Sequence, residues 1–316
     1  MPKATIRDVA AAAGVSISAV SYILNGSEKN KYSEATVKAV RRAAEKLCYV
    51  PNNMARGMRS QRANAIGIVN FFERESPVFA PVLRAVAEEA ARRGVATVIC
   101  TGCEDVSYAS MFGNRTVDGF VIIAPSAAQF NERAHIRALR EVGAPFVIVN
   151  GTVHEEGLSA VYLDYYELSR RAVGHLADLG RQRIVYVDEF SESSARELRD
   201  RREGYVDAVR AEGLLPRAYD IEHIEMEDLM GIDAVLTSRA SVARTLMRRL
   251  LDEGIRVPSA FGILAGSVGG EREDLAAIDF SFDEIGRYAV DAAMGRGEGK
   301  ALSLVPEIIP GKTLRA

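Results

Sequence analysis

Uncharged side chains able to contact base edges follow one face of a helix expected near the amino terminus. The set recurs at i, i+3, i+4 and i+7, with one apolar neighbour, and consists of Ser18, Ser21, Tyr22, Asn25 and the neighbour Ile17. A purely solvated helix face normally carries charged residues, and this face carries none. Serine can donate to or accept from a base edge, and isoleucine can contact a thymine methyl group. The residue types therefore indicate a surface that reads base pairs.

The surrounding sequence predicts three short helices that would present this face. Apolar residues recur with helical spacing over residues 6–13, where Thr5 can cap the start of the helix and Gly14 can end it in a left-handed turn. Ser16 can cap a second helix, and a third is expected from about Ser33 to Leu47. Two short helices joined by a glycine turn and followed by a third make a helix-turn-helix. The pattern leaves open a three-helix bundle without a nucleic-acid partner.

The charge of the chain is unevenly distributed. Residues 1–62 hold eleven Lys and Arg against four Asp and Glu, a surplus of seven positive charges. Because the net charge of the chain is −3, the remaining residues together carry −10. A basic segment attached to an acidic body is typical of a segment that meets phosphates, although basic segments also bind membranes and partner proteins.

The length of 316 residues suits two or three globular units, and 48% hydrophobic residues is ordinary for a globular protein. No apolar run is long enough to span a bilayer, and the amino terminus has no signal-peptide core. The three cysteines show no disulfide spacing. We therefore expect a cytoplasmic protein with no membrane partner.

From about Asn64 onward, short apolar runs alternate with helical patterns. A strand expected over 65–69 is followed by a helix over 78–93, and a strand over 183–187 is followed by a helix over 196–212. Such alternation is typical of parallel sheets covered by helices on both faces. Two successive sets predict two similar α/β subdomains with a cleft between them.

Three motifs could suggest other chemistry, and none is supported by its surroundings. Cys100 and Cys103 lack further metal ligands at short spacing, so structural cysteines are favoured, with redox sensing left open. The glycine-rich run over 266–270 lacks the lysine of a phosphate-binding loop. Acids expected near strand ends, including Asp164 and Asp188, are accompanied in the sequence by no recognisable nucleophile–base pair or metal cluster. We expect neither catalysis nor a cofactor or metal.

Two runs near the amino terminus resemble the lactose-repressor (LacI/GalR) family. They are residues 5–26, TIRDVAAAAGVSISAVSYILNG, and residues 49–60, YVPNNMARGMRS, which resembles the hinge of that family. The resemblance continues through the body at Ser76–Phe79, Val117–Phe120, Gly180–Ile184, Arg201–Tyr205, Val257–Pro258 and Glu284–Gly286.

The resemblance implies a sequence-specific transcriptional regulator, most simply a repressor, that binds a near-palindromic operator in double-stranded DNA as a homodimer. Its all-α helix-turn-helix head would occupy residues 1–50 and a hinge residues 51–62. Residues 63–316 would form an α/β body similar to periplasmic binding proteins, with two parallel-sheet lobes and a small-molecule effector between them. The chain would cross between the lobes near residues 163, 280 and 295.

The resemblance also implies which residues contact DNA. The base-reading positions are occupied by Ile17, Ser18 and Tyr22. The positions that mostly contact phosphates are occupied by Thr5, Ser16, Ser21, Asn25, Ser33, Tyr49 and Asn52. In the hinge, the corresponding residues are Ala55, Arg56 and Met58. Tyr22 replaces an arginine of many members, so the operator of a relative cannot be transferred to this chain.

Met58 stands where the family places a leucine that wedges into the minor groove. Methionine is apolar and long enough to unstack a base step, although a linker methionine without a DNA contact is the alternative. The hinge over 52–59 is too short to form a stable helix alone, since isolated helices below about 12 residues are marginal in water. We therefore expect it to fold only on DNA beside a second copy.

The effector positions implied by the resemblance are Phe71, Phe79, Ser126, Arg201, Ser238, Arg239 and Ser267. Arg201 matches the arginine that grips ligands in the family. Arg239 and Ser267 stand where the family has polar and acidic side chains that bind sugar hydroxyls. Two arginines and fewer acids suggest an anionic effector. The alternatives are that Arg239 pairs with a neighbouring acid or faces solvent.

Two other functions remain open from the sequence. The segments over 101–117 and 218–233 are short compared with the family, so the body could have lost its effector and respond to a partner protein. A solute-binding protein would use the same α/β body but leaves residues 1–60 unexplained.

Overall fold

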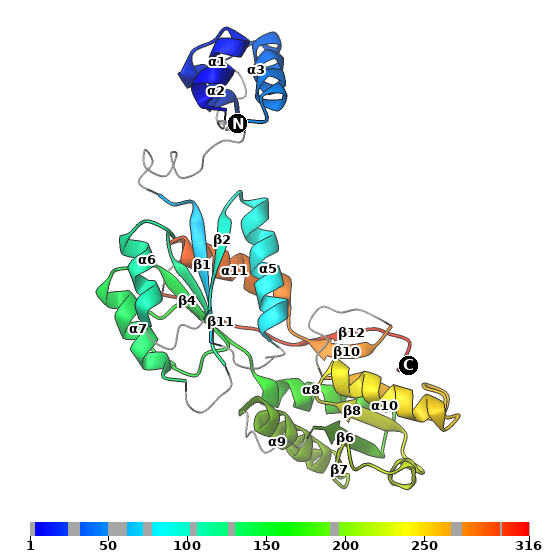
Figure 1. The fold of residues 1–316 in the computed structure, drawn as a ribbon. Helices are drawn as coiled ribbons and strands as arrows, with labels where there is room; N and C mark the ends of the chain where they lie inside the picture. The colour runs from blue at the N-terminus through cyan, green and yellow to red at the C-terminus, as the bar shows by residue number, and fades with distance from the viewer. Residues whose placement is uncertain are drawn as a thin grey trace. The chain divides into compact units, whose positions relative to one another are not determined.

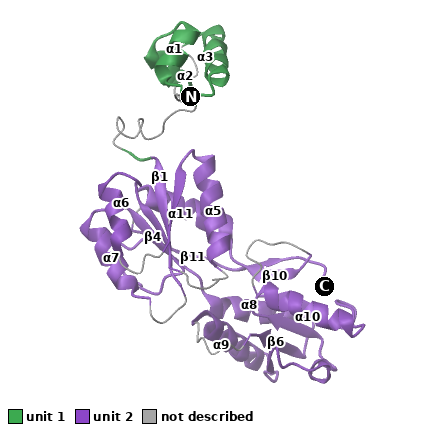
Figure 2. Ribbon diagram, viewed as in Figure 1, with its two compact units in different colours: residues 1–63 green, residues 64–316 purple. Residues whose placement is uncertain are grey.

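A computed structural model describes residues 4–24, 32–49, 62–71, 78–101, 106–125, 130–189, 196–266, 274–297 and 299–315. The chain divides into two compact units, residues 1–63 and residues 64–316 (Figure 2).

The first unit, here called the head, contains the three predicted helices: α1 (Ile6–Ala13), α2 (Ile17–Leu24) and α3 (Glu34–Lys46). Each begins at a hydroxyl cap. The side chains of Thr5, Ser16 and Ser33 accept hydrogen bonds from backbone N–H groups three residues further on. Gly14 ends α1 in the left-handed conformation, with φ of 64°.

The head has a small core of its own. One fully buried valine from each helix meets the others, namely Val9, Val20 and Val40. Within the described part of the chain, no single helix has the length and composition to cross a bilayer. Helices α1 and α2 reach that length only together, across a bend of 102°.

The second unit, the body, contains two six-stranded sheets (Figure 1). The first has the strand order β11-β5-β4-β3-β1-β2, and all its pairings are parallel. Its strands are β1 (Ala65–Asn70), β2 (Ala96–Cys100), β3 (Phe120–Ile123), β4 (Phe146–Val149), β5 (Ala160–Tyr162) and β11 (Ala301–Ser303). Its helices are α5 (Phe79–Arg92), α6 (Ser110–Gly113), α7 (Glu132–Glu141) and α11 (Phe282–Ala293), with a 3₁₀ turn η1 (Val106–Ala109). These elements are here called the amino-terminal lobe.

The second sheet has the order β12-β10-β9-β8-β6-β7, parallel except that β12 runs antiparallel to β10. Its strands are β6 (Ile184–Asp188), β7 (Ala218–Asp220), β8 (Ala234–Thr237), β9 (Gly262–Ala265), β10 (Ala276–Asp279) and β12 (Glu307–Ile309). Helices α8 (Tyr165–Asp178), α9 (Arg196–Ala211) and α10 (Ala240–Asp252) and the turn η2 (Met226–Leu229) complete the carboxy-terminal lobe.

The chain passes between the two sheets three times. The passages lie at residues 163–164, between β5 and α8, at 280–281, between β10 and α11, and at 304–306, between β11 and β12. The expectation of a third crossing near Gly295 is therefore wrong. Gly295 lies in the turn after α11, and β11, which comes later, still belongs to the first sheet. This strand has three residues without an apolar run, so the sequence offered no signal for it.

Two glycines allow helix pairs to pack closely. A Cβ at Gly286 of α11 would lie 2.5 Å from the carbonyl oxygen of Ala85 in α5. A Cβ at Gly204 of α9 would lie 2.2 Å from the carbonyl oxygen of Tyr166 in α8. Real side chains do not approach backbone so closely, because interiors are packed like crystals. Each lobe is therefore braced by one helix pair in direct backbone contact.

Candidate nucleic-acid interface and effector site

The exposed face of α2 carries the three predicted base-reading residues. The side chains of Ile17 and Tyr22 are 38% and 43% exposed, and Ser18 is exposed beside them. The opposite face of the helix buries Val20 and Ile23 in the core of the head. Large apolar and aromatic side chains held in solvent on one short helix are available to a partner.

Three of the predicted phosphate-contacting hydroxyl groups stand at helix amino termini. Thr5, Ser16 and Ser33 are exposed and cap the three helices of the head. Asp8 completes a capping box with Thr5, and the hydrogen bonds from Thr5 lower the pKa of this carboxyl. Helix amino termini attract phosphate groups through free N–H groups and the helix dipole. The caps therefore stabilise the head and also place positive helix ends at its surface.

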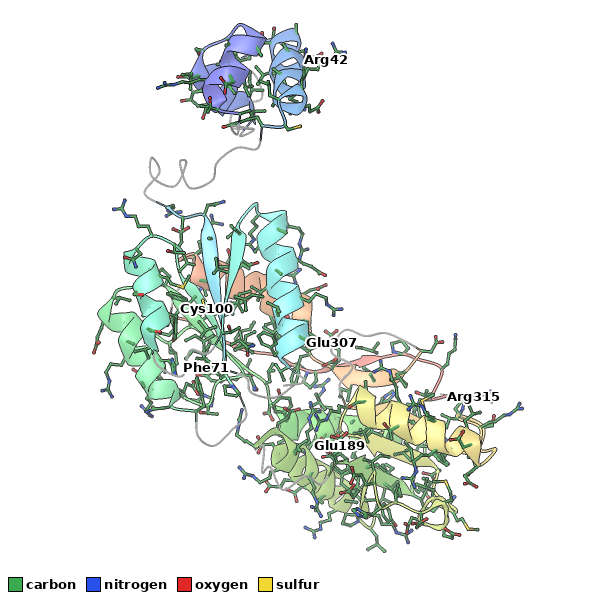
Figure 3. All side chains as sticks on the ribbon, in the orientation of Figure 1. Arg42, Phe71, Cys100, Glu189, Glu307 and Arg315 are labelled. Atoms are coloured by element: carbon green, nitrogen blue, oxygen red, sulfur yellow. The ribbon has the colours of Figure 1, made fainter. Side chains whose placement is uncertain are left out.

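Helix α3 adds positive charge to the head. Four exposed cations stand against two exposed acids along it, and the cations are Lys38, Arg41, Arg42 and Lys46 (Arg42 is labelled in Figure 3). Tyr49, after this helix, is half-buried against the core of the head, and its N–H donates to the carbonyl of Ala44 over 2.9 Å. Ser21, another predicted phosphate contact, is half-buried in α2, and the other predicted DNA contacts, Asn25, Asn52, Ala55, Arg56 and Met58, lie outside the described residues.

In the carboxy-terminal lobe, Arg201 is buried at the carboxyl end of the sheet. Its residue is only 2% exposed, and Nη1 donates to the carbonyl oxygen of Gly266, directly after β9, over 2.8 Å. Its Nε lies 3.4 Å from Oε1 of Glu197. Burial is the largest influence on the pKa of Arg201 and would lower it, but the surrounding acidic groups, with Glu197 foremost, together outweigh burial, so the pKa is raised. The guanidinium is therefore held charged and already has a carboxylate partner.

Asp188 ends β6 and is the centre of a buried polar cluster. Its carboxylate accepts hydrogen bonds from the Ser238 hydroxyl, from the Tyr186 hydroxyl over 3.1 Å and from the Glu189 N–H over 2.8 Å. Burial raises the pKa of Asp188, although these hydrogen bonds oppose the shift. Ser238 is thus close to the predicted site but donates to Asp188.

Arg239 is paired with an acid, as the alternative interpretation of the sequence held. Its Nη2 lies 3.7 Å from Oε2 of Glu189, which is labelled in Figure 3. In the carboxy-terminal lobe, Arg201 and Arg239 are therefore each paired with a carboxylate, and Asp188 is hydrogen-bonded to the backbone of one of these partners, Glu189. Ser267 and Ser126 lie outside the described residues.

In the amino-terminal lobe, Phe71 follows β1 and belongs to an aromatic cluster that the sequence did not predict. Its ring centroid lies 4.6 Å from those of Phe130 and His135. The Tyr108 hydroxyl lies 2.9 Å from Nδ1 of His135, and burial lowers the pKa of this histidine and so favours its neutral form. The members come from separate segments, and only the position of Phe71 after a strand was a usable signal.

Phe79, the other aromatic residue predicted at the site, begins α5 and packs half-buried against the main core. A cavity of about 250 Å³ lies between α5, the second crossing and β12, and its lining includes Arg84, Asp279 and Glu307. None of the predicted effector residues lines this cavity. Around Cys100, which is buried, and elsewhere in the described ranges, no group of three metal-ligating side chains gathers.

The residues at both lobes are found where parallel α/β sheets usually bind ligands. Phe71, Asp188, Ser238 and Gly266 directly follow or end parallel strands at their carboxyl ends. Ligands of such sheets bind outside the carboxyl ends of the strands, where loops supply the side chains.

Both units of the chain match protein families that contain bacterial regulators or periplasmic binding proteins. Residues 5–52 match the bacterial regulatory proteins of the lacI family. Residues 63–230, more than half of the chain, match the periplasmic binding proteins and sugar binding domain of the LacI family. Residues 173–314 match a periplasmic binding protein-like domain.

Individual relatives cover most of the chain. The transcriptional regulator CelR of Thermobifida fusca is 28% identical over 274 residues, which are 76% of this chain and 78% of that protein. GalR of Escherichia coli K12 is 28% identical over 274 residues, which are 83% of this chain and 78% of that protein. The lac repressor dimer bound to operator and an anti-inducer superposes with a TM-score of 0.65 at 20% identity, covering 99% of both chains. The chain belongs to the LacI family of bacterial transcriptional regulators.

Proposed function

We propose that this regulator binds a near-palindromic operator as a homodimer and that a small molecule between its lobes changes the strength of that binding. The observation that carries the DNA-binding part is the exposed face of α2, where Ile17, Ser18 and Tyr22 stand together without charge. The capped helix amino termini and the cations of α3 support it, because they suit phosphates on either side of a groove.

The hinge is part of this proposal. Paired hinges of a two-fold dimer would enter the minor groove at the centre of the operator, with Met58 as the wedge. The effector would shift the population of lobe arrangements and thereby the spacing of the hinges.

The charges at the strand ends favour a neutral effector over the anionic one that Arg201 and Arg239 suggest. Each arginine has a carboxylate within 4 Å, Glu197 for Arg201 and Glu189 for Arg239. A bound anion would therefore compete with these carboxylates and meet Asp188 as well. A ligand with several hydroxyl groups would instead donate to carboxylates and accept from guanidinium groups, and its apolar face would suit aromatic rings such as Phe71.

The test of the proposed function is a selection of randomised duplex DNA on the purified chain, followed by sequencing of the retained DNA. A palindromic motif with a fixed centre is expected. Retention of DNA without any motif, by a chain shown to be folded, would contradict sequence-specific binding.

The effector part is tested separately by thermal unfolding with panels of neutral sugars and of acidic or phosphorylated metabolites. A ligand that binds only the folded protein raises the melting temperature, by an amount that grows with its concentration. We expect neutral compounds to raise it. Stabilisation by anions alone would overturn the assignment of a neutral effector. If neither panel raises the melting temperature, the alternative is favoured in which the body has lost its effector and responds to a partner protein.

A further inference from the structure

Tyr165 contacts both lobes of the body. It begins α8 in the carboxy-terminal lobe, directly after the first crossing, and is 1% exposed. Its hydroxyl donates to Oδ1 of Asn150 over 3.2 Å. Asn150 follows β4 in the amino-terminal lobe, and its Nδ2 donates to the carbonyl oxygen of Ala124, after β3, over 3.1 Å. A side-chain hydrogen bond thus connects the start of α8 to the strand ends of the other lobe.

The ring of Tyr165 supports Arg201. The guanidinium carbon lies 4.6 Å from the centre of the ring, within the range of a cation–π contact. Phe280, in the second crossing, packs edge-on against the same ring, with centroids 5.8 Å apart and planes at 82°. Burial raises the pKa of Tyr165 well above its ordinary value, so the hydroxyl keeps its proton and remains a donor.

Helix packing ties these contacts together. Arg201 lies on α9, and Gly204 one turn later brings α9 against the backbone of Tyr166 in α8 with no room for a Cβ. The helices that carry Tyr165 and Arg201 are therefore in direct backbone contact. A displacement of Arg201 reaches Asn150 through the ring and hydroxyl of a single side chain.

We infer that Tyr165 is a positioning residue that couples Arg201 to the amino-terminal lobe. Its ring holds the guanidinium at the strand ends of one lobe, and its hydroxyl holds the angle between the lobes. The role of Arg201 toward an effector rests on the proposed function, whereas the coupling between the lobes does not.

The test uses the full chain and the distance between the lobes. Spin labels are attached to cysteines at the exposed positions Arg137 of α7 and Arg248 of α10, after Cys48 and Cys103 are changed to serine. The labelled chain is diluted with unlabelled chain, and double electron–electron resonance gives the distribution of distances. Tyr165→Phe removes only the hydroxyl. Tyr166→Phe is the matched control, because the Tyr166 hydroxyl donates to Asp207 of the same lobe over 3.0 Å.

In Tyr165→Phe we expect a broader or shifted distance distribution, and in Tyr166→Phe the distribution of the parent chain. Identical distributions in all three proteins would overturn the coupling. This outcome is independent of whether an operator or an effector is found, so it is distinguishable from a failure of the proposed function.

The support of Arg201 by the ring has its own readout. Hydrogen exchange at Nε of Arg201, followed by NMR, is expected to be unchanged in Tyr165→Phe and faster in Tyr165→Leu. Faster exchange in the phenylalanine variant, whose ring is intact, would contradict this role even if the leucine variant fails to fold.

Discussion

At the scale of single residues, the head and the body use their side chains in opposite ways. In the head, Ile17 and Tyr22 remain in solvent, although burying such side chains contributes about 1.5–3 kcal/mol each. In the body, Arg201 and Asp188 are buried, where an uncompensated charge is costly and is tolerated only with partners. Exposed apolar groups and buried charges both depart from what folding alone favours. Substitutions at the exposed apolar side chains of the head and at the buried charges of the body therefore test function.

Tyr22→Ala should relax base discrimination at one or two symmetric operator positions. Wild-type protein is expected to distinguish bases there by about 1–3 kcal/mol, and the variant should lose most of that difference because the exposed ring no longer reaches the groove. The measurement is binding to single-base variants of the selected operator. Tyr22→Phe, which keeps the ring, is the matched control. An unchanged base preference in the alanine variant would show that Tyr22 contacts only phosphate or protein.

Asp188→Asn should change how stability depends on pH. Because the folded-state pKa of Asp188 is raised above its ordinary value of 3.8, the folded protein takes up this proton at a higher pH than the unfolded chain does. Stability from this group is therefore present at low pH and lost as pH rises through the raised pKa. Relative to Asp188→Asn, the free energy of unfolding of the wild type should rise as pH falls toward 3.8. Urea unfolding of both proteins across this range is the measurement, and a constant difference would contradict the buried position of the carboxylate.

At the scale of elements, helices were the most predictable parts of the chain. The caps at Thr5, Ser16 and Ser33 and the turn at Gly14 are local, so the sequence located all three helices of the head. The strands β1 and β6 were located by continuous apolar runs, which are typical of strands covered on both faces. The short strands β5, β7, β11 and β12 have three residues each and were not predicted. Such strands are defined by their neighbours in the sheet rather than by their own pattern.

Gly204→Ala tests the contact between α8 and α9. A methyl group there would overlap the backbone of Tyr166, and overpacking of this kind typically costs about 1–3 kcal/mol. Gly174→Ala in α8 is the matched control, because its Cβ would meet no atom within 4 Å and alanine is the better helix former by about 0.4–1 kcal/mol. Denaturant unfolding should therefore show a destabilised first variant and a control that is equal to or more stable than the wild type. Equal stability of both variants would mean that the helices separate easily.

At the scale of the whole molecule, the two units have separate cores and opposite charge. The core of the head shares no residue with the clusters of the body. In the sequence, the segment that joins the units contains Met58, where we predict the wedge. A structural change in the body matters to DNA only if it alters how two such segments meet.

Met58→Ser should weaken binding to the selected operator much more than binding to unrelated DNA. Only the specific complex is expected to open the minor groove. Serine has no apolar side chain to insert between the base pairs, so the complex loses contacts that offset the cost of unstacking and bending the DNA. Titration of both DNAs at one salt concentration is the measurement, since non-specific affinity depends strongly on salt. An equal loss of affinity for both DNAs would contradict the role of Met58 as a wedge in the minor groove.

The sequence by itself determined the family, the two-part architecture and the helices, because caps, glycine turns and apolar periodicity act between residues close in the chain. The resemblance to the family also implied Arg201 and Phe71 as effector positions, which stay predictions. Only the tertiary structure decided what surrounds them. The pairing of Arg239 with Glu189, the cluster of Phe71 with His135, and the bond from Tyr165 to Asn150 all join separate segments. Strand order brings those segments together, and strand order is set by packing of the whole sheet, which no local pattern records.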